Sequence, residues 1–482
     1  MSEIKSYKML IDGKWVDAES GETFITVNPA TQEPLARVPK AGDADVDKAV
    51  QAAKKALPAW KGLSQAERNV YMNKIAAAIR DNAHELATCE ALEHGTPYQD
   101  AFGVCMGAAG KFEYAASIAL SLMGIQIPME KNQVSYFKRG PMGVAALVIP
   151  WNFPIIMLAV KASAALAVGN TCVIKPPSIN SMTDLVFANV IQSAGLPDGV
   201  INVITGSGET VGKSLCSHPD VDVIGFTGSS ETGQNVLSYA APTVKKCVME
   251  LGGNNPVLVY PDADLDALIS VLGFRQFNNC GQHCSGPGRY YVHEKVYDEF
   301  LEKFAAFADS ISVGDPLAKD TFMGPVVSKA QQKKIEDYVA GAVQEGAKVY
   351  YTRVKTPEQE KGSYVMPTIV SEVTHDMKIA KEEVFGPVAA VIRWKDGDDI
   401  VGMANDSEYG LCAHVWTKNL ALALQLADQL NVGNVFINCQ TLSEEQSWGT
   451  NVKASGLGRE GGLEGLKEFT DLKEITMDYS AF

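Results

Sequence analysis

A cysteine and a glutamate near the middle of the chain have the side chains needed for chemistry on a carbonyl group. Residues 277–288 read FNNCGQHCSGPG, and Glu250, in the segment MELGGNNP at 249–256, precedes Cys284 by 34 positions. The Cys284 thiolate is a candidate nucleophile. Glu250 stands among apolar residues and glycines, so burial would raise its pKa toward the range of a general base. A plain buried cysteine and a satisfied structural carboxylate are the alternative interpretations.

The same cysteine segment could also hold a metal ion. Cys280, His283 and Cys284 have the residue types and the short spacing that suit zinc, but no second cysteine or histidine cluster completes a site. We therefore predict no metal. His283 could lower the pKa of the neighbouring thiol, although a packing role is favoured, and Cys280 is interpreted as structural.

Two further motifs could bind a phosphate-containing ligand. GFTGSSETG at 225–233 follows an apolar strand and opens a predicted helix, so Gly228 and Ser229 could offer backbone N–H groups and a hydroxyl to a phosphate. A capped helix start explains this motif equally well. Lys175, in IKPPS, ends a predicted strand at the sheet edge where ligands bind in open sheets. An exposed lysine at a strand end is the alternative.

The elements that must position these residues alternate between strand and helix. Apolar runs at 144–150, 171–176, 200–206 and 221–228 are separated by helix-like stretches, which is typical of a parallel sheet with crossover helices and of nucleotide binding. A second α/β set begins near Pro256. We therefore predict an α/β fold with a Rossmann-like parallel-sheet cofactor domain, a second α/β catalytic domain and a small β element.

Local signals add detail to this outline. Ser64 and Glu67 form a predicted capping box for a helix that ends near Gly95, and Asp12-Gly13 predicts a hairpin turn. Residues 126–137 look like an inserted hairpin. The apolar segment 154–174 is long enough to span a bilayer, but Lys161 and the break at Gly169-Asn170 favour a buried helix, a turn and a buried strand.

Composition narrows the function classes. The 482-residue chain has a formal net charge of −15, which disfavours nucleic acid and anionic membranes as partners. Its nine cysteines are scattered along a long chain and do not resemble a disulfide framework, so we expect reduced thiols and a cytoplasmic location. The first ten residues lack the apolar run of a signal peptide.

Taken together, the motifs resemble those of the aldehyde dehydrogenase superfamily, of the NAD(P)-dependent, non-acylating type. FNNCGQHC is similar to the active-site cysteine signature of that family, and MELGGNNP to its glutamate signature. WNFP at 151–154, IKPPS, GFTGS, EEVFGPV at 382–388 and KASG at 453–456 match in the order and at the spacing of the family. The resemblance covers nearly the whole chain.

The resemblance implies a mechanism in which an aldehyde is oxidised to a carboxylic acid through a thiohemiacetal and a thioester. Cys284 would attack the aldehyde carbon, while Asn152 and the Cys284 backbone N–H would stabilise the oxyanion. Glu250 would activate the water that hydrolyses the thioester. Lys161 resembles the lysine that the family links to proton relay near the glutamate.

The resemblance also implies a site for NADP or NAD. Ser229 would lie at the pyrophosphate, Lys175 and Glu383 at the ribose hydroxyls, and Phe385 near the nicotinamide, with Gly228, Trp151 and Ile149 also at the cofactor. Three residues after Lys175, many NAD-preferring members have a glutamate, whereas this chain has Ser178. Because a carboxylate there would repel a 2′-phosphate, we favour NADP, with dual use allowed.

The substrate side is less defined. By resemblance, an apolar tunnel of moderate width, which suits medium aliphatic or aromatic aldehydes, would be lined by Phe153, Met157, Val160, Met106 and His283. WGTNV at 448–452 departs from the usual Pro-aromatic-Gly-Gly run, and the nearby segment QTLSEEQS at 440–447 contains Glu444 and Glu445. These carboxylates could favour a cationic or polar aldehyde, although a solvated loop face is the favoured interpretation.

The family pattern also predicts domains and assembly. We expect a dinucleotide-binding domain at 1–120 and 142–252 and a catalytic domain at 253–452. Residues 121–141 and 453–482 would form an oligomerisation element and C-terminal tail that join a homodimer or homotetramer through sheet edges. A CoA-acylating aldehyde dehydrogenase, a thiol esterase and a non-catalytic structural protein on the same fold stay open as alternatives.

Overall fold

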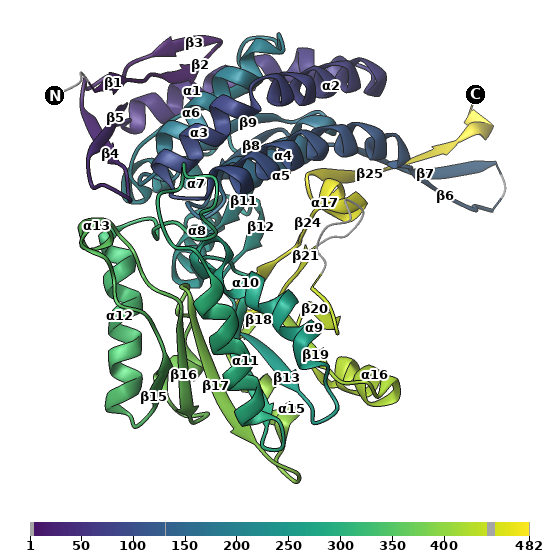
Figure 1. Ribbon diagram of the computed structural model, residues 1–482. Helices are drawn as coiled ribbons and strands as arrows, with labels where there is room; N and C mark the ends of the chain where they lie inside the picture. The colour runs from purple at the N-terminus through teal and green to yellow at the C-terminus, as the bar shows by residue number, and fades with distance from the viewer. Residues whose placement is uncertain (1–3, 131, 441–448, 482) are drawn as a thin grey trace.

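The computed structural model (Figure 1) describes residues 4–130, 132–440 and 449–481. Two large sheets, each with helices packed against it, form the body of the molecule. A narrow antiparallel ribbon extends away from that body and contains the C-terminal strand (Figure 1). The fold is therefore α/β, as the alternation of apolar runs and helix-like stretches predicts.

The first large sheet contains eight strands in the order β23-β12-β11-β8-β9-β10-β2-β3. Its five central strands are parallel, and the outer strands are antiparallel to their neighbours. Central strands that are covered on both faces read as continuous apolar runs, which explains why the sequence revealed them. The strands are β2 (Met9–Ile11), β3 (Lys14–Val16), β8 (Val144–Val148), β9 (Thr171–Lys175), β10 (Ile201–Val203), β11 (Val223–Thr227), β12 (Lys246–Glu250) and β23 (Gly456–Leu457).

The strand order of this sheet reverses next to β8. The chain runs from β8 to β9 and β10 on one side, and then returns to place β11 and β12 on the other side of β8. In open parallel sheets, ligands bind in the crevice at the carboxyl ends of the strands where the order reverses. The segments that follow β8 and β11 are therefore the expected walls of a binding site.

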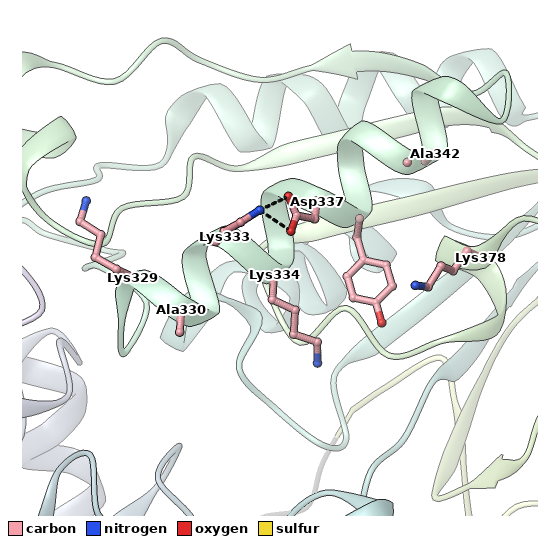
Figure 2. Close-up of a pocket in the computed structure, with 9 residues that line it drawn as sticks. Lys329, Ala330, Lys333, Lys334, Asp337, Ala342 and Lys378 are labelled. Atoms are coloured by element: carbon pink, nitrogen blue, oxygen red, sulfur yellow. Dashed lines mark hydrogen bonds and ion pairs between the residues drawn. The ribbon is translucent and has the colours of Figure 1, made fainter.

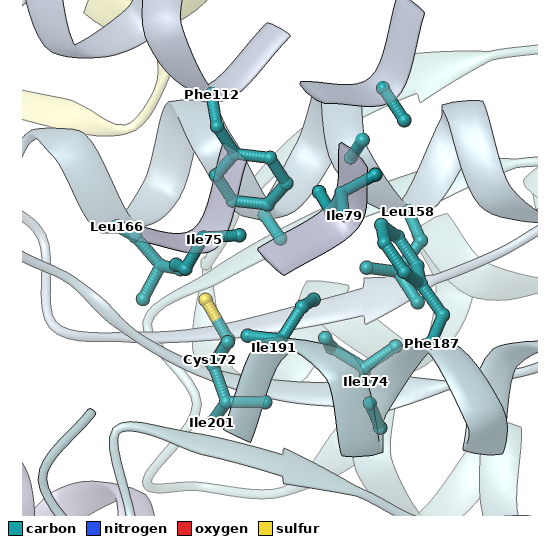
Figure 3. Packing of buried hydrophobic residues seen from close by; sticks show 14 of the residues in the cluster. Ile75, Ile79, Phe112, Leu158, Leu166, Cys172, Ile174, Phe187, Ile191 and Ile201 are labelled. Carbon is teal, nitrogen blue, oxygen red and sulfur yellow. The ribbon is translucent and has the colours of Figure 1, made fainter. Parts of the chain in front are cut away.

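Helices cover both faces of the first sheet. In Figure 3, Ile75, Phe112 and Leu158 of three different helices pack with Cys172 of β9 and Ile201 of β10 in one apolar cluster. The helices are α1 (Asp43–Gly62), α2 (Gln65–Asp81), α3 (Ala83–Glu93), α4 (Tyr98–Ile118), α5 (Pro154–Ala167), α6 (Ser181–Ser193), α7 (Lys213–Ser217), α8 (Ser230–Ala240) and α17 (Gly462–Glu468).

The predicted capping box is confirmed, but the helix it starts is shorter than predicted. The Ser64 hydroxyl accepts a hydrogen bond from the Glu67 backbone N–H, and the Glu67 carboxylate accepts one from the Ser64 N–H. The helix predicted to end near Gly95 is divided at Asn82 into α2 and α3. The Asn82 side-chain amide donates to the Ala78 carbonyl at 2.8 Å, so it competes with the helical backbone for that acceptor.

The apolar segment 154–174 folds as predicted. It forms α5, a turn at Gly169 with φ of 103°, and the buried strand β9. Among the described residues, none of the helices has the length and apolar character needed to cross a membrane.

The second large sheet contains seven strands in the order β15-β16-β17-β14-β13-β19-β20, and only the β15–β16 pair is antiparallel. The chain leaves the first sheet at the end of β12 and enters the second at Asn255, so the change of sheet falls in the MELGGNNP segment. Its strands are β13 (Asn255–Val259), β14 (Pro287–His293), β15 (Lys348–Tyr351), β16 (Thr368–Val373), β17 (Val388–Trp394), β19 (Cys412–Trp416) and β20 (Asn434–Ile437). Its helices are α9 (Leu265–Leu268), α10 (Phe274–Phe277), α11 (Tyr297–Ser310), α12 (Lys329–Gln344), α13 (Pro357–Lys361), α14 (Lys378–Lys381), α15 (Ile400–Asn405) and α16 (Leu420–Gln429).

The ribbon confirms the predicted hairpin. Strand β6 (Ile125–Ile127) pairs antiparallel with β7 (Gln133–Pro141), and β7 pairs along its whole length with β25 (Thr470–Asp478). The predicted turn at Asp12-Gly13 is also present, with φ of 50° and 74°, between β2 and β3. Short sheets complete the fold: β1 (Lys5–Ser6), β4 (Thr23–Val27) and β5 (Pro34–Pro39), then β18 (Tyr409–Gly410) with β22 (Val452–Lys453), and β21 (Gly449–Thr450) with β24 (Arg459–Glu460).

Candidate active site

A cavity of about 750 Å³ lies where the strand order of the first sheet reverses, and it is closed on its other side by segments of the second sheet. Eleven of the residues singled out from the sequence line it: Ile149, Trp151, Asn152, Phe153, Met157, Lys175, Gly228, Ser229, Cys284, Glu383 and Phe385. The cavity thus joins the candidate thiol to the candidate phosphate-binding loop.

Cys284 lies on the loop between α10 and β14, and its backbone is held firmly. The Asn255 side-chain amide donates to the carbonyls of Cys284 at 2.8 Å and of Gly286 at 2.7 Å. Burial, and to a smaller extent the charges of Glu250 and Glu383, raise the pKa of the Cys284 thiol to about 12 against the opposing charge of Arg275. The thiol therefore needs a base or a neighbouring cation to act as a nucleophile.

Asn152 connects the loop after β8 with the cysteine loop. Its side-chain amide donates to the Gln282 carbonyl at 2.9 Å, and its own carbonyl accepts from the Asn279 amide at 3.0 Å. A primary amide has two N–H groups, so one is left to point at a ligand oxygen in the cavity. A fixed amide donor beside a nucleophile is the arrangement that stabilises a developing oxyanion.

Glu250 ends β12 and is 8% exposed. Its carboxylate accepts a hydrogen bond from the Asn451 amide at 2.9 Å. Burial, together with the charge of Glu460, raises its pKa to about 8 against the opposing effects of Asn451 and Lys161. A carboxyl group with a pKa in this range can take a proton from water near neutral pH.

A buried ion pair lies behind Glu250. The ammonium of Lys161, on α5, pairs with the carboxylate of Glu460, on β24, and the Lys161 side chain has no exposed surface. Because Glu460 and Lys161 both act on the charge of Glu250, the three groups form one electrostatic cluster.

The loop before α8, the candidate phosphate-binding loop, forms a capped helix start. Ser229 caps α8 by accepting a hydrogen bond from the Thr232 N–H at 3.2 Å. A Cβ at Gly228 would lie 2.6 Å from the Phe226 ring, so this position requires glycine. Both residues face the cavity, where the first N–H groups of α8 and its dipole favour an anionic group.

Two further buried ionisable groups, those of Lys175 and Glu383, line the same cavity. The Lys175 ammonium donates to the Pro176 carbonyl at 2.9 Å, and burial lowers its pKa to about 8. The Glu383 carboxylate accepts from the Gly253 N–H at 2.9 Å, and burial raises its pKa to about 7. Groups of this kind can bond to the hydroxyls of a sugar.

An aromatic pair closes the cavity between these groups and the thiol. The Phe385 and Trp151 rings meet edge to face, with centroids 5.3 Å apart. Phe385 has φ of 57°, and its carbonyl accepts from the Gln331 amide at 2.8 Å, which holds this uncommon backbone conformation in place. Together, the fixed anion-binding loop, the polar groups and the flat apolar wall fit a dinucleotide.

Comparison with known proteins identifies the family to which the chain belongs. The sequence profile of the aldehyde dehydrogenase family matches residues 15–475. The chain belongs to the aldehyde dehydrogenase family. It is 41% identical to the mitochondrial aldehyde dehydrogenase of Leishmania tarentolae, over 97% of this chain and 94% of that protein.

Solved structures of aldehyde dehydrogenase relatives agree with the fold and the cofactor class. The aldehyde dehydrogenase of Bacillus cereus in complex with NAD+ is 37% identical, with a TM-score of 0.95, over 98% of this chain and 97% of that chain. A 3,6-anhydro-L-galactose dehydrogenase in complex with NADP is 34% identical, with a TM-score of 0.96, over 98% and 100% of the two chains. This family member is thus an NAD(P)-dependent aldehyde oxidoreductase.

Some residues predicted for the aldehyde dehydrogenase site do not line the cavity. Glu250 and Lys161 lie behind it, and the Ser178 hydroxyl donates to the Gly206 carbonyl at 2.9 Å. Val160 lies on α5, and Met106, on α4, is 38% exposed. Their roles stay predictions. Glu444 and Glu445 lie outside the described residues.

His283 contacts a backbone carbonyl and an aromatic ring. Its Nε2 lies 3.0 Å from the Asn278 carbonyl, and its ring packs on Phe153 with centroids 4.8 Å apart. Burial lowers its pKa well below the usual value, and the Arg275 charge lowers it further. A neutral His283 cannot support a thiolate by charge.

Sequence reasoning missed several residues that the fold brings to this aldehyde dehydrogenase site. Asn451 and Glu460 reach the Glu250 cluster from the far end of the chain, and Gln331 supports Phe385 from α12. None of these positions carried a local signal. Other lining residues outside the predicted set include Ser207, Glu209, Gly212, Asn235, Tyr239 and Lys334.

A second hollow, of about 650 Å³, runs along α12 (Figure 2). Its lysines include Lys329, Lys333 and Lys378, and the Lys333 ammonium is bonded to Asp337 on the same helix, as the dashed lines show. Lys334 lines both this hollow and the aldehyde dehydrogenase cavity. The hollow contains none of the predicted site residues and is a groove on the outer face of the second sheet's helices.

Proposed function

We propose that this chain oxidises an aldehyde to a carboxylic acid through a covalent bond to Cys284. The thiolate attacks the carbonyl carbon, and the free N–H of the Asn152 amide, with the Cys284 backbone N–H, holds the oxyanion of the thiohemiacetal. Each such donor lowers a barrier by about 3–4 kcal/mol in comparable sites. The observation that carries the proposal is that Cys284, Asn152 and the α8 N-terminus line one cavity.

The residues present fit a nicotinamide cofactor. Ser229 and Gly228 would hold its pyrophosphate, Lys175 and Glu383 its ribose hydroxyls, and Phe385, with Trp151 and Ile149, its nicotinamide end. A nicotinamide held by these residues would supply the oxidising power for the reaction, since a thiohemiacetal becomes a thioester when its carbon loses a hydride to an acceptor. Fixed groups that exclude water on this side protect the reacting carbon from side reactions.

Glu250 then supplies the base for hydrolysis. As a carboxylate it takes a proton from the water that attacks the thioester carbon; the carbon–sulfur bond breaks, the acid leaves and the Cys284 thiol is restored. Lys161 and Glu460 lie behind Glu250 and form the route by which that proton moves away.

We further propose that the cofactor is NADP, with NAD also accepted. Ser178 is exposed, and its hydroxyl is bonded to the Gly206 carbonyl, so position 178 contributes no carboxylate to repel a 2′-phosphate. Relatives of both cofactor types exist among the structural neighbours. A lower kcat/KM with NADP than with NAD would contradict this preference.

The test compares Cys284→Ala with Cys280→Ala under aldehyde, NADP or NAD, and no CoA. Cys280 is buried with its thiol toward the Gly324 carbonyl, so it is a matched cysteine in the same loop. We expect Cys284→Ala to lose reduced-cofactor formation by at least about 10³-fold while it still binds cofactor, because the nucleophile is gone. Cys280→Ala should retain turnover. Turnover by Cys284→Ala would remove Cys284 as the nucleophile.

The alternatives differ in their products. A CoA-acylating enzyme would release acyl-CoA and would need CoA for turnover, a thiol esterase would act without nicotinamide, and a structural protein would not turn over. The buried base Glu250 favours hydrolysis over acyl transfer to CoA. Free acid formed without CoA, in step with cofactor reduction, is the expected product.

The cysteines support a proposal about location. All nine cysteines are free, and the chemistry above requires the Cys284 thiol to be in the reduced state. We propose a reducing cytoplasmic environment, and fractionation of the source cells is the measurement that checks it.

A further inference from the structure

Arg275 is a cation beside the nucleophile that the chemistry above does not use. It lies on α10, and its Nη2 donates to the Ser285 hydroxyl at 2.7 Å. Ser285 directly follows Cys284, and the guanidinium is close enough to Cys284 to lower the pKa of its thiol. The Nε of Arg275 is buried and makes no hydrogen bond. One of its donors is therefore unused.

No carboxylate of the described residues forms an ion pair with Arg275, and the nearby acids are held by other groups. Asp100, which faces the same loop from α4, accepts from the Asn278 amide at 2.7 Å. Glu250 accepts from Asn451, and Glu383 accepts from the Gly253 N–H. The groups on which Arg275 acts are the thiols of Cys284 and Cys412 and the imidazoles of His283 and His414.

An unpaired guanidinium in a half-buried place is costly, because a charge that loses water needs a partner of opposite charge. Arginine stays protonated in proteins, and its planar fork matches a carboxylate through two parallel hydrogen bonds. Gln440 adds a second polar side chain: its amide donates to the Ser285 carbonyl at 3.1 Å, while its Oε1 has no partner. Within the part of the chain that the structure describes, no anion therefore pairs with the guanidinium beside Cys284.

We propose that Arg275 binds a carboxylate on the substrate, so that this enzyme acts on aldehydes with an acid group at the other end of a short chain. The inference rests on the proposed function, since it places the aldehyde carbon at Cys284. Ser285 and Arg275 then hold the carboxylate end. Because Arg275 contacts the residue next to the nucleophile, the two ends of the substrate bind near each other, which selects a short chain over a long one.

A competing role for Arg275 is activation of the Cys284 thiol. A cation near a thiol favours the thiolate, and that effect would help all aldehydes equally. A carboxylate-binding role helps only substrates that carry the charge. The experiment therefore compares two substrates of the same shape that differ in charge.

The substrates are 4-oxobutanoate and its methyl ester, with butanal as a further neutral aldehyde. They are measured with the wild-type enzyme, Arg275→Gln, Arg275→Lys and the control Arg37→Gln, which changes an exposed arginine of β5. Thermal unfolding of each variant, and the rate at which iodoacetamide alkylates Cys284 across pH, show whether the fold and the thiol are unchanged.

We expect the wild type to prefer 4-oxobutanoate over its ester. Arg275→Gln should lower kcat/KM for 4-oxobutanoate by about 10- to 150-fold, the range of a lost hydrogen bond to a charged group, and change it for the ester and butanal by less than about 3-fold. Arg275→Lys should recover part of the loss, because lysine keeps the positive charge but lacks the planar guanidinium that makes two parallel hydrogen bonds.

Two results would overturn the inference. One is an equal fall for charged and neutral aldehydes together with slower alkylation of Cys284, which assigns Arg275 to thiol activation. The other is a wild-type enzyme that oxidises the ester and butanal but does not prefer 4-oxobutanoate, which leaves the proposed function intact. If the wild type binds cofactor but oxidises none of the three, the proposed function fails as well.

Discussion

Glu250 is the residue whose protonation state the structure makes most informative. Burial raises its pKa to about 8, so at neutral pH most of the carboxyl is protonated, and the basic form appears as pH rises through that value. We therefore expect the rate of thioester hydrolysis to rise with pH through about 8. Pre-steady-state measurement of acid release after a single turnover reports this step directly.

The matched variant is Glu250→Gln, which keeps the shape and removes the base. We expect it to slow hydrolysis by about 10²- to 10⁴-fold, to abolish the rise near pH 8 and to leave cofactor binding unchanged. The stability of the fold should change in the opposite direction to the hydrolysis rate and fall as pH rises. Since the folded pKa lies above the ordinary value of 4.5, ionisation of Glu250 removes stability as pH rises from about 4.5 to 8, and Glu250→Gln should reduce that loss. An unchanged pH profile of hydrolysis would contradict the role of Glu250 as base.

At the same scale, the sequence identified the reactive groups better than their surroundings. Cys284 and Glu250 were found as a thiol and a carboxyl group in short glycine-containing motifs, and Asn152 was found through the resemblance of WNFP to the family pattern. Arg275 was not found, because the sequence around the short helix α10 does not reveal which side chains will surround the guanidinium.

At the scale of elements, the cysteine loop depends on backbone conformations that only small side chains permit. Asn279, Cys280 and Gly281 have φ of 48°, 56° and 65°, so three successive residues are left-handed. A Cβ at Gly281 would lie 2.3 Å from the Gly386 carbonyl oxygen and 2.7 Å from that of Gln276. The turn therefore brings the loop against the segment that contains Phe385.

Gly281→Ala should disturb this contact. We expect it to destabilise the fold by about 2–4 kcal/mol, from the strained φ and the overlap with two carbonyls, and to lower activity because the same loop holds Cys284. The control is Gly341→Ala, on α12, where a Cβ meets nothing within 4 Å and helix propensity favours alanine by about 0.5–1 kcal/mol. Thermal unfolding measures both. A Gly281→Ala melting temperature equal to that of the wild type would contradict the packing argument.

Some helices and strands were predicted correctly from the sequence, whereas one helix break was not. The buried parallel strands and the capping box at Ser64 are local patterns and were found. The break at Asn82 was not, because the choice between a continuing helix and a side-chain bond to Ala78 depends on how α2 and α3 pack against the sheet.

At the scale of the whole molecule, the ribbon of β6, β7 and β25 is the candidate contact between copies of the chain. It stands away from the body, and its strands expose Ile125 at 59%, Leu472 at 47% and Met477 at 42%. Apolar side chains on a sheet edge favour association. We predict a homodimer or homotetramer joined through this ribbon.

Light scattering of the wild type and of Ile125→Lys tests the prediction. We expect the wild type at the mass of a dimer or tetramer, and a smaller species for Ile125→Lys, because a charge on the edge strand opposes burial. Leu424→Lys, at another exposed apolar residue, on α16, is the control and should keep the wild-type mass. A monomeric wild type would end this proposal.

The sequence by itself determined the family, the fold class, the candidate nucleophile and base, and the loop at α8, because side-chain chemistry and short-range periodicity are written locally along the chain. Only the tertiary structure decided that Lys161 pairs with Glu460, 299 positions away, that Asn451 holds Glu250, and that Arg275 donates to Ser285. The domain limits stay a prediction, although the change of sheet falls between Glu250 and Asn255. Contacts between distant segments follow from how whole elements pack, and that packing leaves no local pattern to read.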